Sequence, residues 1–187
     1  MIRWPIVTAL IFTAQMVAAG AVPGDSLYQL RLTLLNQDAH ETAFESFRGQ
    51  PLLVSMFYAS CPDVCPTTIA NMKRIDRDAG SAGLRVLMIS FDERHDTSET
   101  LLALANLHGV NTERWTFATV RGNDVRKIAA ALGIKYRPLP DGQFNHSTRV
   151  SLLDREGRIV AQTSQILQVD PEFMREVSTY LGAEQPR

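Results

Sequence analysis

The two cysteines of this 187-residue chain stand four positions apart, in the segment Cys61-Pro62-Asp63-Val64-Cys65-Pro66. Because there is no third cysteine, a framework of several disulfides is excluded and the pair can form one bridge at most within the chain. A bridge that closes so short a loop removes little entropy from the unfolded chain, so stability explains it poorly. At this spacing the two sulfurs can bind one metal ion or form one disulfide. Either role would be functional and would not serve mainly to stabilise the fold.

Two thiolates alone leave a metal ion short of ligands, and the chain has four histidines that could complete a site: His40, His95, His108 and His146. His40 falls in a polar turn, and His108 ends a predicted helix, where the dipole favours a cation. His146 directly precedes a predicted hairpin, which in a thioredoxin-like fold begins beside the cysteine loop. Two sulfurs and one imidazole suit Cu(I), whereas zinc usually takes four ligands. Spacing alone leaves open whether His146 is a ligand or a surface histidine.

The elements around the cysteines can be predicted from the local pattern. Residues 51–58 form an almost continuous apolar run, which is typical of a central strand buried on both faces. After Pro66 apolar residues recur every three positions until Gly80, which predicts an amphipathic helix beginning near the second cysteine. The start of a helix carries unpaired N–H groups and the positive end of its dipole, so we expect the pKa of one or both thiols to fall.

The rest of the chain alternates predicted strands and helices. Further strands are expected at 30–35, 84–90, 115–119, 150–153 and 158–160, and helices at 96–108, 124–132 and from 170 onward, ended by Gly182. Asp96 and Glu99 resemble a capping box at the start of the second helix. The alternation requires crossovers and a largely parallel sheet, to which the late hairpin adds antiparallel strands. We therefore predict an α/β, thioredoxin-like fold with a mixed central sheet, helices on both faces and a late β-hairpin.

The first 21 residues are typical of an export signal. A short segment with Arg3 precedes a mostly apolar run, and Ala19-Gly20-Ala21 fits a cleavage site. The alternative is an uncleaved membrane anchor, but the run is short and is interrupted by Gln15. We expect a signal peptide at 1–21, a thioredoxin-like domain at 22–187 and an exported protein, periplasmic if bacterial. The formal net charge of -1 gives no basic excess that would indicate nucleic-acid binding.

Several motifs together resemble the Sco (SenC) family of thioredoxin-fold copper chaperones, which serve the binuclear copper centre of cytochrome c oxidase. The motifs are Cys61–Pro66, the preceding Phe57-Tyr58, the following Thr67-Thr68, the segment Ser90–Thr97 and His146-Ser147. The resemblance runs in order from about residue 36 to residue 181. It implies that Cys61, Cys65 and His146 bind copper, as Cu(I) or Cu(II). It also implies a copper-receiving partner, either a membrane oxidase subunit or another cuproprotein.

Three positions depart from the family pattern. Ala59-Ser60 stands where the family usually has a threonine before the first cysteine, and Glu93 stands where a proline is common. Asn145 replaces an aspartate that usually precedes the histidine, which removes a carboxylate that could orient the imidazole. The three implied ligands are intact.

Two functions follow from the same residues. A metallochaperone would hold copper and pass it on by ligand exchange. A thiol-disulfide oxidoreductase would use Cys61 and Cys65 as a redox pair to reduce cysteines of the copper-receiving protein. A separate thiol reductant would then return Cys61 and Cys65 to the reduced state. A sensor of copper or redox state is a third, weaker reading. His146 discriminates between the first two, because a copper site needs the imidazole and thiol exchange does not.

Overall fold

The computed structural model describes residues 20–62, 64–80 and 83–183. The predicted signal peptide at 1–21 lies outside this part of the chain except for Gly20 and Ala21, and Asp63, between the cysteines, also lies outside it. Within the described ranges, no helix combines the length and the apolar character needed to cross a bilayer.

Seven strands form a mixed central sheet. They are β1 (Thr33–Asn36), β2 (Glu41–Ala43), β3 (Leu52–Phe57), β4 (Arg85–Ser90), β5 (Trp115–Val120), β8 (Val150–Leu153) and β9 (Ile159–Thr163). Their spatial order is β2-β1-β5-β4-β3-β8-β9. Strand β4 pairs in parallel with both β3 and β5, and every other neighbouring pair in this sheet is antiparallel. A separate two-stranded ribbon pairs β6 (Tyr136–Pro138) with β7 (Phe144–His146).

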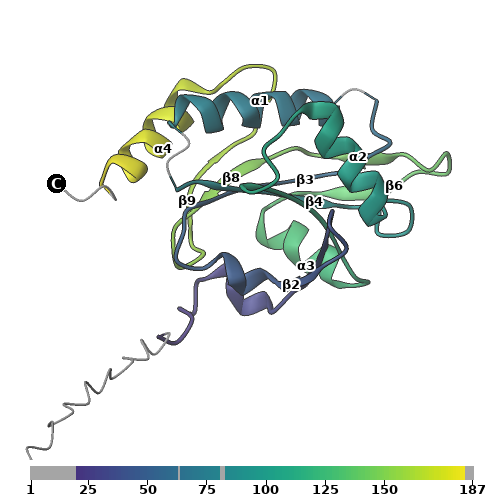
Figure 1. Cartoon of the computed structure of the whole chain (residues 1–187), viewed down its shortest axis with the longest axis horizontal. Coiled ribbons are helices and arrows are strands. Elements are labelled where there is room, and N and C mark those ends of the chain that lie inside the picture. The colour runs from purple at the N-terminus through teal and green to yellow at the C-terminus, as the bar shows by residue number, and fades with distance from the viewer. Residues whose placement is uncertain (1–19, 63, 81–82, 184–187) are drawn as a thin grey trace, which may run out of the picture.

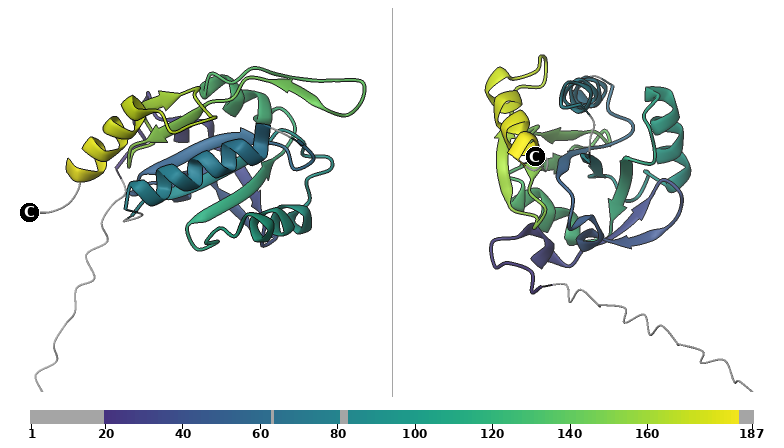
Figure 2. Two further views of the ribbon diagram at one scale, coloured as in Figure 1. Left: turned by 90° about the horizontal axis from the view of Figure 1, so that it is seen from above. Right: turned by 60° about the vertical axis from the view of Figure 1, so that its left-hand side comes forward.

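Helices cover both faces of the central sheet. They are η1 (Leu27–Leu30), η2 (Phe44–Phe47), α1 (Val64–Asp78), α2 (Ser98–His108), α3 (Asp124–Ala131) and α4 (Pro171–Ala183), of which η1 and η2 are short 3-10 helices. In Figures 1 and 2, α1 and α4 lie over one face of the sheet and α3 lies on the other. The predicted α/β, thioredoxin-like architecture is thereby confirmed, including the late hairpin of β8 and β9.

The middle of the sheet supports the cysteine loop. All six residues of β3 are buried, as the apolar run predicted, and β3 is held between β4 and β8. The apolar face of α1 is also buried, with Ile69, Met72 and Ile75 fully enclosed in the core. The loop between β3 and α1 is therefore anchored at both ends by packed elements, which limits the movement of the two cysteines.

The structure corrects three local expectations. Helix α2 begins at Ser98, and Thr97 caps it by accepting a hydrogen bond from the Thr100 backbone N–H, so the prediction that Asp96 starts the helix is wrong. Helix α4 continues through Gly182 to Ala183 instead of ending before that glycine. The β6–β7 ribbon was not predicted, and residues 139–143 connect its two strands.

Candidate metal centre

The loop from β3 to α1 brings the two cysteine sulfurs together. The Cys61 backbone N–H donates to the Tyr58 carbonyl at 3.2 Å, which turns the chain directly after the strand. The Cys65 backbone N–H, in the first turn of α1, donates to Cys61 Sγ at 3.3 Å. Both cysteines are free thiols and both are buried. The turn and the first residues of α1 thus hold the Cys61 sulfur against the backbone of Cys65.

His146 reaches the same place from a distant part of the chain. It is the last residue of β7, where it lies opposite Tyr136 across the ribbon, and it is half-buried. One ligand atom from each of Cys61, Cys65 and His146 lies within 4.8 Å of the other two. The structure therefore brings together the three residues that the sequence singled out. The start of the β8–β9 hairpin lies beside β3, where Ser55 Oγ donates to the Arg149 carbonyl at 2.9 Å, and it is the β6–β7 ribbon that carries His146 to the cysteines.

The ring of His146 has a defined polar neighbour. Its Nδ1 lies 3.2 Å from the Ser147 carbonyl oxygen, an acceptor. A proton on Nδ1 is donated to that carbonyl, which leaves the lone pair of Nε2 available to a metal ion. The Ser147 carbonyl thus favours the tautomer in which Nε2 carries the lone pair.

Aromatic rings enclose the imidazole. The ring centroid of Phe91 lies 5.0 Å from that of His146, and that of Tyr58 lies 5.9 Å away in an edge arrangement. Tyr58 is buried, and its hydroxyl donates to Gln143 Oε1 at 2.7 Å. Sequence reasoning gave these two rings no part in the site, although each directly follows a buried parallel strand. Side chains at the same ends of neighbouring parallel strands meet at one edge of the sheet.

Burial changes the expected ionisation of the second cysteine. Removal from water raises the pKa of the Cys65 thiol, and Cys61 and Asp96 add to the rise. Of the two thiols, one or both of which were expected to have a lowered pKa, Cys65 has a raised one, chiefly because burial removes its hydration. Burial also raises the pKa of Tyr58. A cation bound between the sulfurs would supply the charge that favours thiolate, so binding would release protons.

Asp96 ties the cysteine loop to the sheet. Its Oδ2 accepts hydrogen bonds from the Ala59 backbone N–H at 2.9 Å and from Ser90 Oγ at 2.5 Å. The side chain is buried, and this burial raises its pKa, with the charge of Asp92 adding to the effect. Asp96 therefore links the end of β4 to the segment just before Cys61, a tertiary role that local capping rules could not reveal.

Two of the family departures lie at exposed positions. Glu93 is exposed, and its carboxylate accepts from the Gly122 backbone N–H. Asn145 is exposed and lies opposite Arg137 in the ribbon. Successive residues of a strand point to opposite faces, so Asn145 faces away from the side on which His146 meets the cysteines. Neither residue supplies a donor atom to the group of three.

The donor set itself limits the chemistry. Thiolate sulfurs and imidazole nitrogen suit Cu(I) and fall one short of the four ligands that zinc usually takes. The same two sulfurs are placed to form one disulfide. The geometry thus supports a copper site, a redox pair, or both in alternation.

Comparisons with known proteins agree on one family. A family model described as SCO1/SenC matches residues 22–182. The SCO1 protein homolog of Bacillus subtilis is 24% identical over 162 residues, which is 83% of this chain and 84% of that protein.

Solved structures show the same fold. Bradyrhizobium japonicum ScoI with copper bound superposes with a TM-score of 0.65 at 23% identity, over 80% of this chain and 96% of that one. BsSco, described as having a disulfide switch and as a member of the Sco family of cytochrome c oxidase assembly proteins, gives a TM-score of 0.66 at 19% identity. That match covers 80% of this chain and 91% of the other.

Proposed function

The chain belongs to the SCO1/SenC family, and on that premise we propose that it is an exported copper metallochaperone. It holds copper as cargo through Cys61, Cys65 and His146 and delivers it to the binuclear copper site of cytochrome c oxidase or a similar cuproprotein. One observation carries the proposal: three donor atoms of the right chemistry, two from the β3–α1 connection and one from β7, lie within 4.8 Å of one another. Copper-bound ScoI and the oxidase-assembly description of BsSco add support from relatives.

A site with three protein ligands is suited to transfer. An acceptor ligand can enter the coordination sphere before the original ligands leave, so copper need not be released into water. The half-buried His146 is the most exposed of the three residues, since both cysteines are buried. We therefore place the exchange at the imidazole side of the site.

The transfer test uses the reduced protein loaded with one Cu(I) and the reduced, copper-free copper domain of a cytochrome c oxidase subunit II. A strong Cu(I) chelator is present to capture any copper released into solution. After separation, copper measured by atomic absorption should be found on the acceptor domain. Copper that stays on this chain, or that reaches only the chelator, would contradict delivery.

Thiol-disulfide exchange by Cys61 and Cys65 is the second candidate function. The observation that favours it is the closeness of two free thiols, with the Cys65 N–H directed at Cys61 Sγ. In such exchange one sulfur attacks as thiolate and the other resolves the mixed disulfide; burial raises the pKa of Cys65 and so disfavours its thiolate form. The two functions can alternate, because copper loading requires reduced sulfurs.

Export makes a separate prediction. If residues 1–21 are a cleaved signal peptide, protein purified from its native host should begin near Val22. Intact-mass spectrometry of the soluble extracytoplasmic fraction measures this directly. A full-length chain that stays with the membranes would instead identify the segment as an anchor.

A further inference from the structure

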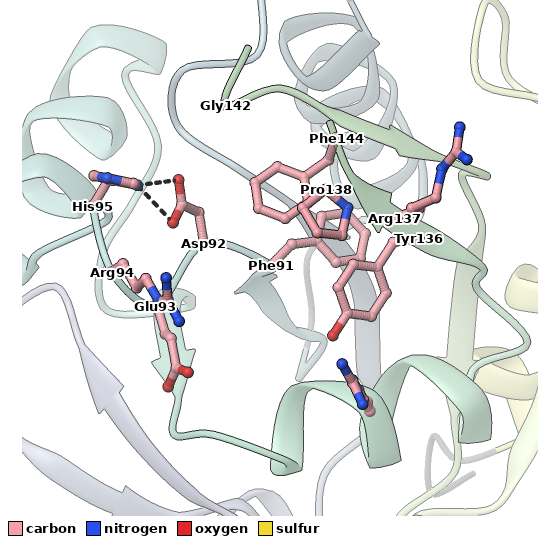
Figure 3. Close-up of a pocket in the computed structure, with 11 residues that line it drawn as sticks. Phe91, Asp92, Glu93, Arg94, His95, Tyr136, Arg137, Pro138, Gly142 and Phe144 are labelled. Carbon is pink, nitrogen blue, oxygen red and sulfur yellow. Dashed lines mark hydrogen bonds and ion pairs between the residues drawn. The ribbon is translucent and has the colours of Figure 1, made fainter. Parts of the chain in front are cut away.

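A cavity of about 550 Å³ lies beside the metal centre and contains none of the three candidate ligands in its lining. Its volume falls within the range of roughly 300–1,000 Å³ that is usual for binding pockets. Figure 3 shows its aromatic side chains gathered in the middle, Phe91, Tyr136 and Phe144 with Pro138 among them, and Asp92, Glu93, Arg94 and His95 on one side. The cavity is thus an apolar floor with charged residues around it.

The aromatic floor of the cavity contacts the imidazole of the candidate metal centre. The rings of Phe91 and Tyr136 stack with centroids 4.9 Å apart, and Phe91 lies 5.0 Å from His146. Phe144 lies 6.1 Å from Phe91 and is two residues before His146 in β7. A molecule resting on this floor is therefore separated from the imidazole by a single layer of aromatic rings.

The acidic side chains around the cavity have partners within the protein, whereas its arginines form no ion pair in the described part of the chain. Asp92 is bound to His95 Nδ1 at 2.8 Å, as the dashed lines in Figure 3 show, and Glu93 accepts from the Gly122 N–H. Arg94, Arg126 and Arg137 are exposed, and no ion pair involves any of them within the described part of the chain. The two carboxylates have hydrogen-bond partners within the protein, whereas the three guanidinium groups outnumber them and lie at solvent-exposed positions, so the rim carries a small positive excess that favours a negatively charged occupant.

We propose that this cavity docks an acidic segment of the copper-receiving protein. The segment would place an aromatic or long apolar side chain on Phe91 and Tyr136 and direct its carboxylates to the arginines. Aromatic stacking and arginine–carboxylate pairs are the contacts that dominate protein interfaces of this kind. Docking here would hold the acceptor next to the aromatic layer that contacts His146. The inference rests on the proposed function, because it takes the occupant to be the protein that receives copper.

The test uses three acetylated and amidated peptides as probes: Asp-Glu-Trp-Glu-Asp, Lys-Lys-Trp-Lys-Lys and Ser-Gln-Trp-Gln-Ser. Each is titrated into the ¹⁵N-labelled, reduced protein and followed by NMR. The acidic peptide should shift the amide signals of Phe91, Tyr136 and Phe144. It should bind about tenfold more tightly than the neutral peptide, since charge pairs at a partly exposed rim have modest individual effects. The basic peptide should not bind there.

Charge reversal separates docking from general attraction. The double variant Arg94→Glu with Arg126→Glu should lose about tenfold or more in affinity for the acidic peptide. Arg74→Glu with Arg175→Glu, an equal charge change on exposed helical arginines outside the cavity, should lose little. Equal loss in both variants, equal binding of all three peptides, or signal shifts elsewhere would overturn the docking site. Copper titration of the same preparations separates the docking site from the proposed copper-binding function. Normal copper binding without peptide binding would refute the docking site and leave the copper-binding function standing.

Discussion

Oxidation of the protein to a Cys61–Cys65 disulfide should abolish copper binding. Copper needs the thiolate form of each sulfur, and a disulfide removes both donors at once. The two sulfurs lie within 4.8 Å of each other, so the bridge can form with a small movement of the loop. With His146 alone remaining, we expect affinity to fall by more than about 100-fold, since losing even a group that only supports a ligand costs about 10–100-fold.

The measurement is an anaerobic Cu(I) titration against a competing chelator, on matched oxidised and reduced samples. The reduced sample should bind one copper, and the oxidised sample should regain that capacity after treatment with a thiol reductant. This recovery is the control for damage during oxidation. If oxidised protein bound one copper with unchanged affinity, the assignment of both sulfurs as ligands would be wrong.

Replacement of His146 by alanine should weaken copper binding strongly while leaving the fold and the thiol chemistry in place. Loss of a ligand should lower affinity at least as much as the roughly 10–100-fold expected for a supporting residue. The fold should persist, because the half-buried ring contributes contacts to Phe91 and Tyr58 of about 0.5–1.5 kcal/mol each at most. Disulfide exchange by Cys61 and Cys65 should persist because its nucleophile is a thiolate.

The matched control is His40→Ala, which removes an exposed imidazole at the turn before β2. Copper affinity and the rate of exchange with a model disulfide are measured on each preparation, with circular dichroism to verify folding. The control should behave as the unmodified protein in all three. Unchanged copper affinity in His146→Ala, together with lost exchange, would place His146 in a redox mechanism and remove the main support for the chaperone.

Continuous apolar runs allowed the centre of this fold to be predicted from sequence. Strands β3 and β4 are buried on both faces, so their composition marks them without any knowledge of their partners. The β6–β7 ribbon could not be recognised in the same way. Its strands are three residues long and partly exposed, β6 ends in Pro138, and the two strands pair only with each other. The placement of His146 in a strand was therefore missed, although its position beside the cysteines was expected.

Within the site, residue identity was predictable but environment was not. Cys61 and Cys65 stand out by chemical type and spacing, whereas His146 was selected among four histidines by the resemblance; the structure brings the three together. The pKa of Cys65 depends on how completely the surrounding side chains exclude water, which local sequence does not encode. Asp96 misled for a related reason: it matches a capping pattern, yet its hydrogen bonds go to Ala59 and Ser90.

The most direct test of the central claim is X-ray absorption spectroscopy at the copper edge, on reduced protein loaded with one Cu(I). The account predicts two sulfur scatterers and one imidazole nitrogen around the metal, and loss of the imidazole signal in His146→Ala but not in His40→Ala. A spectrum with sulfur scatterers alone, or one that the His146 substitution leaves unchanged, would contradict the three-residue site.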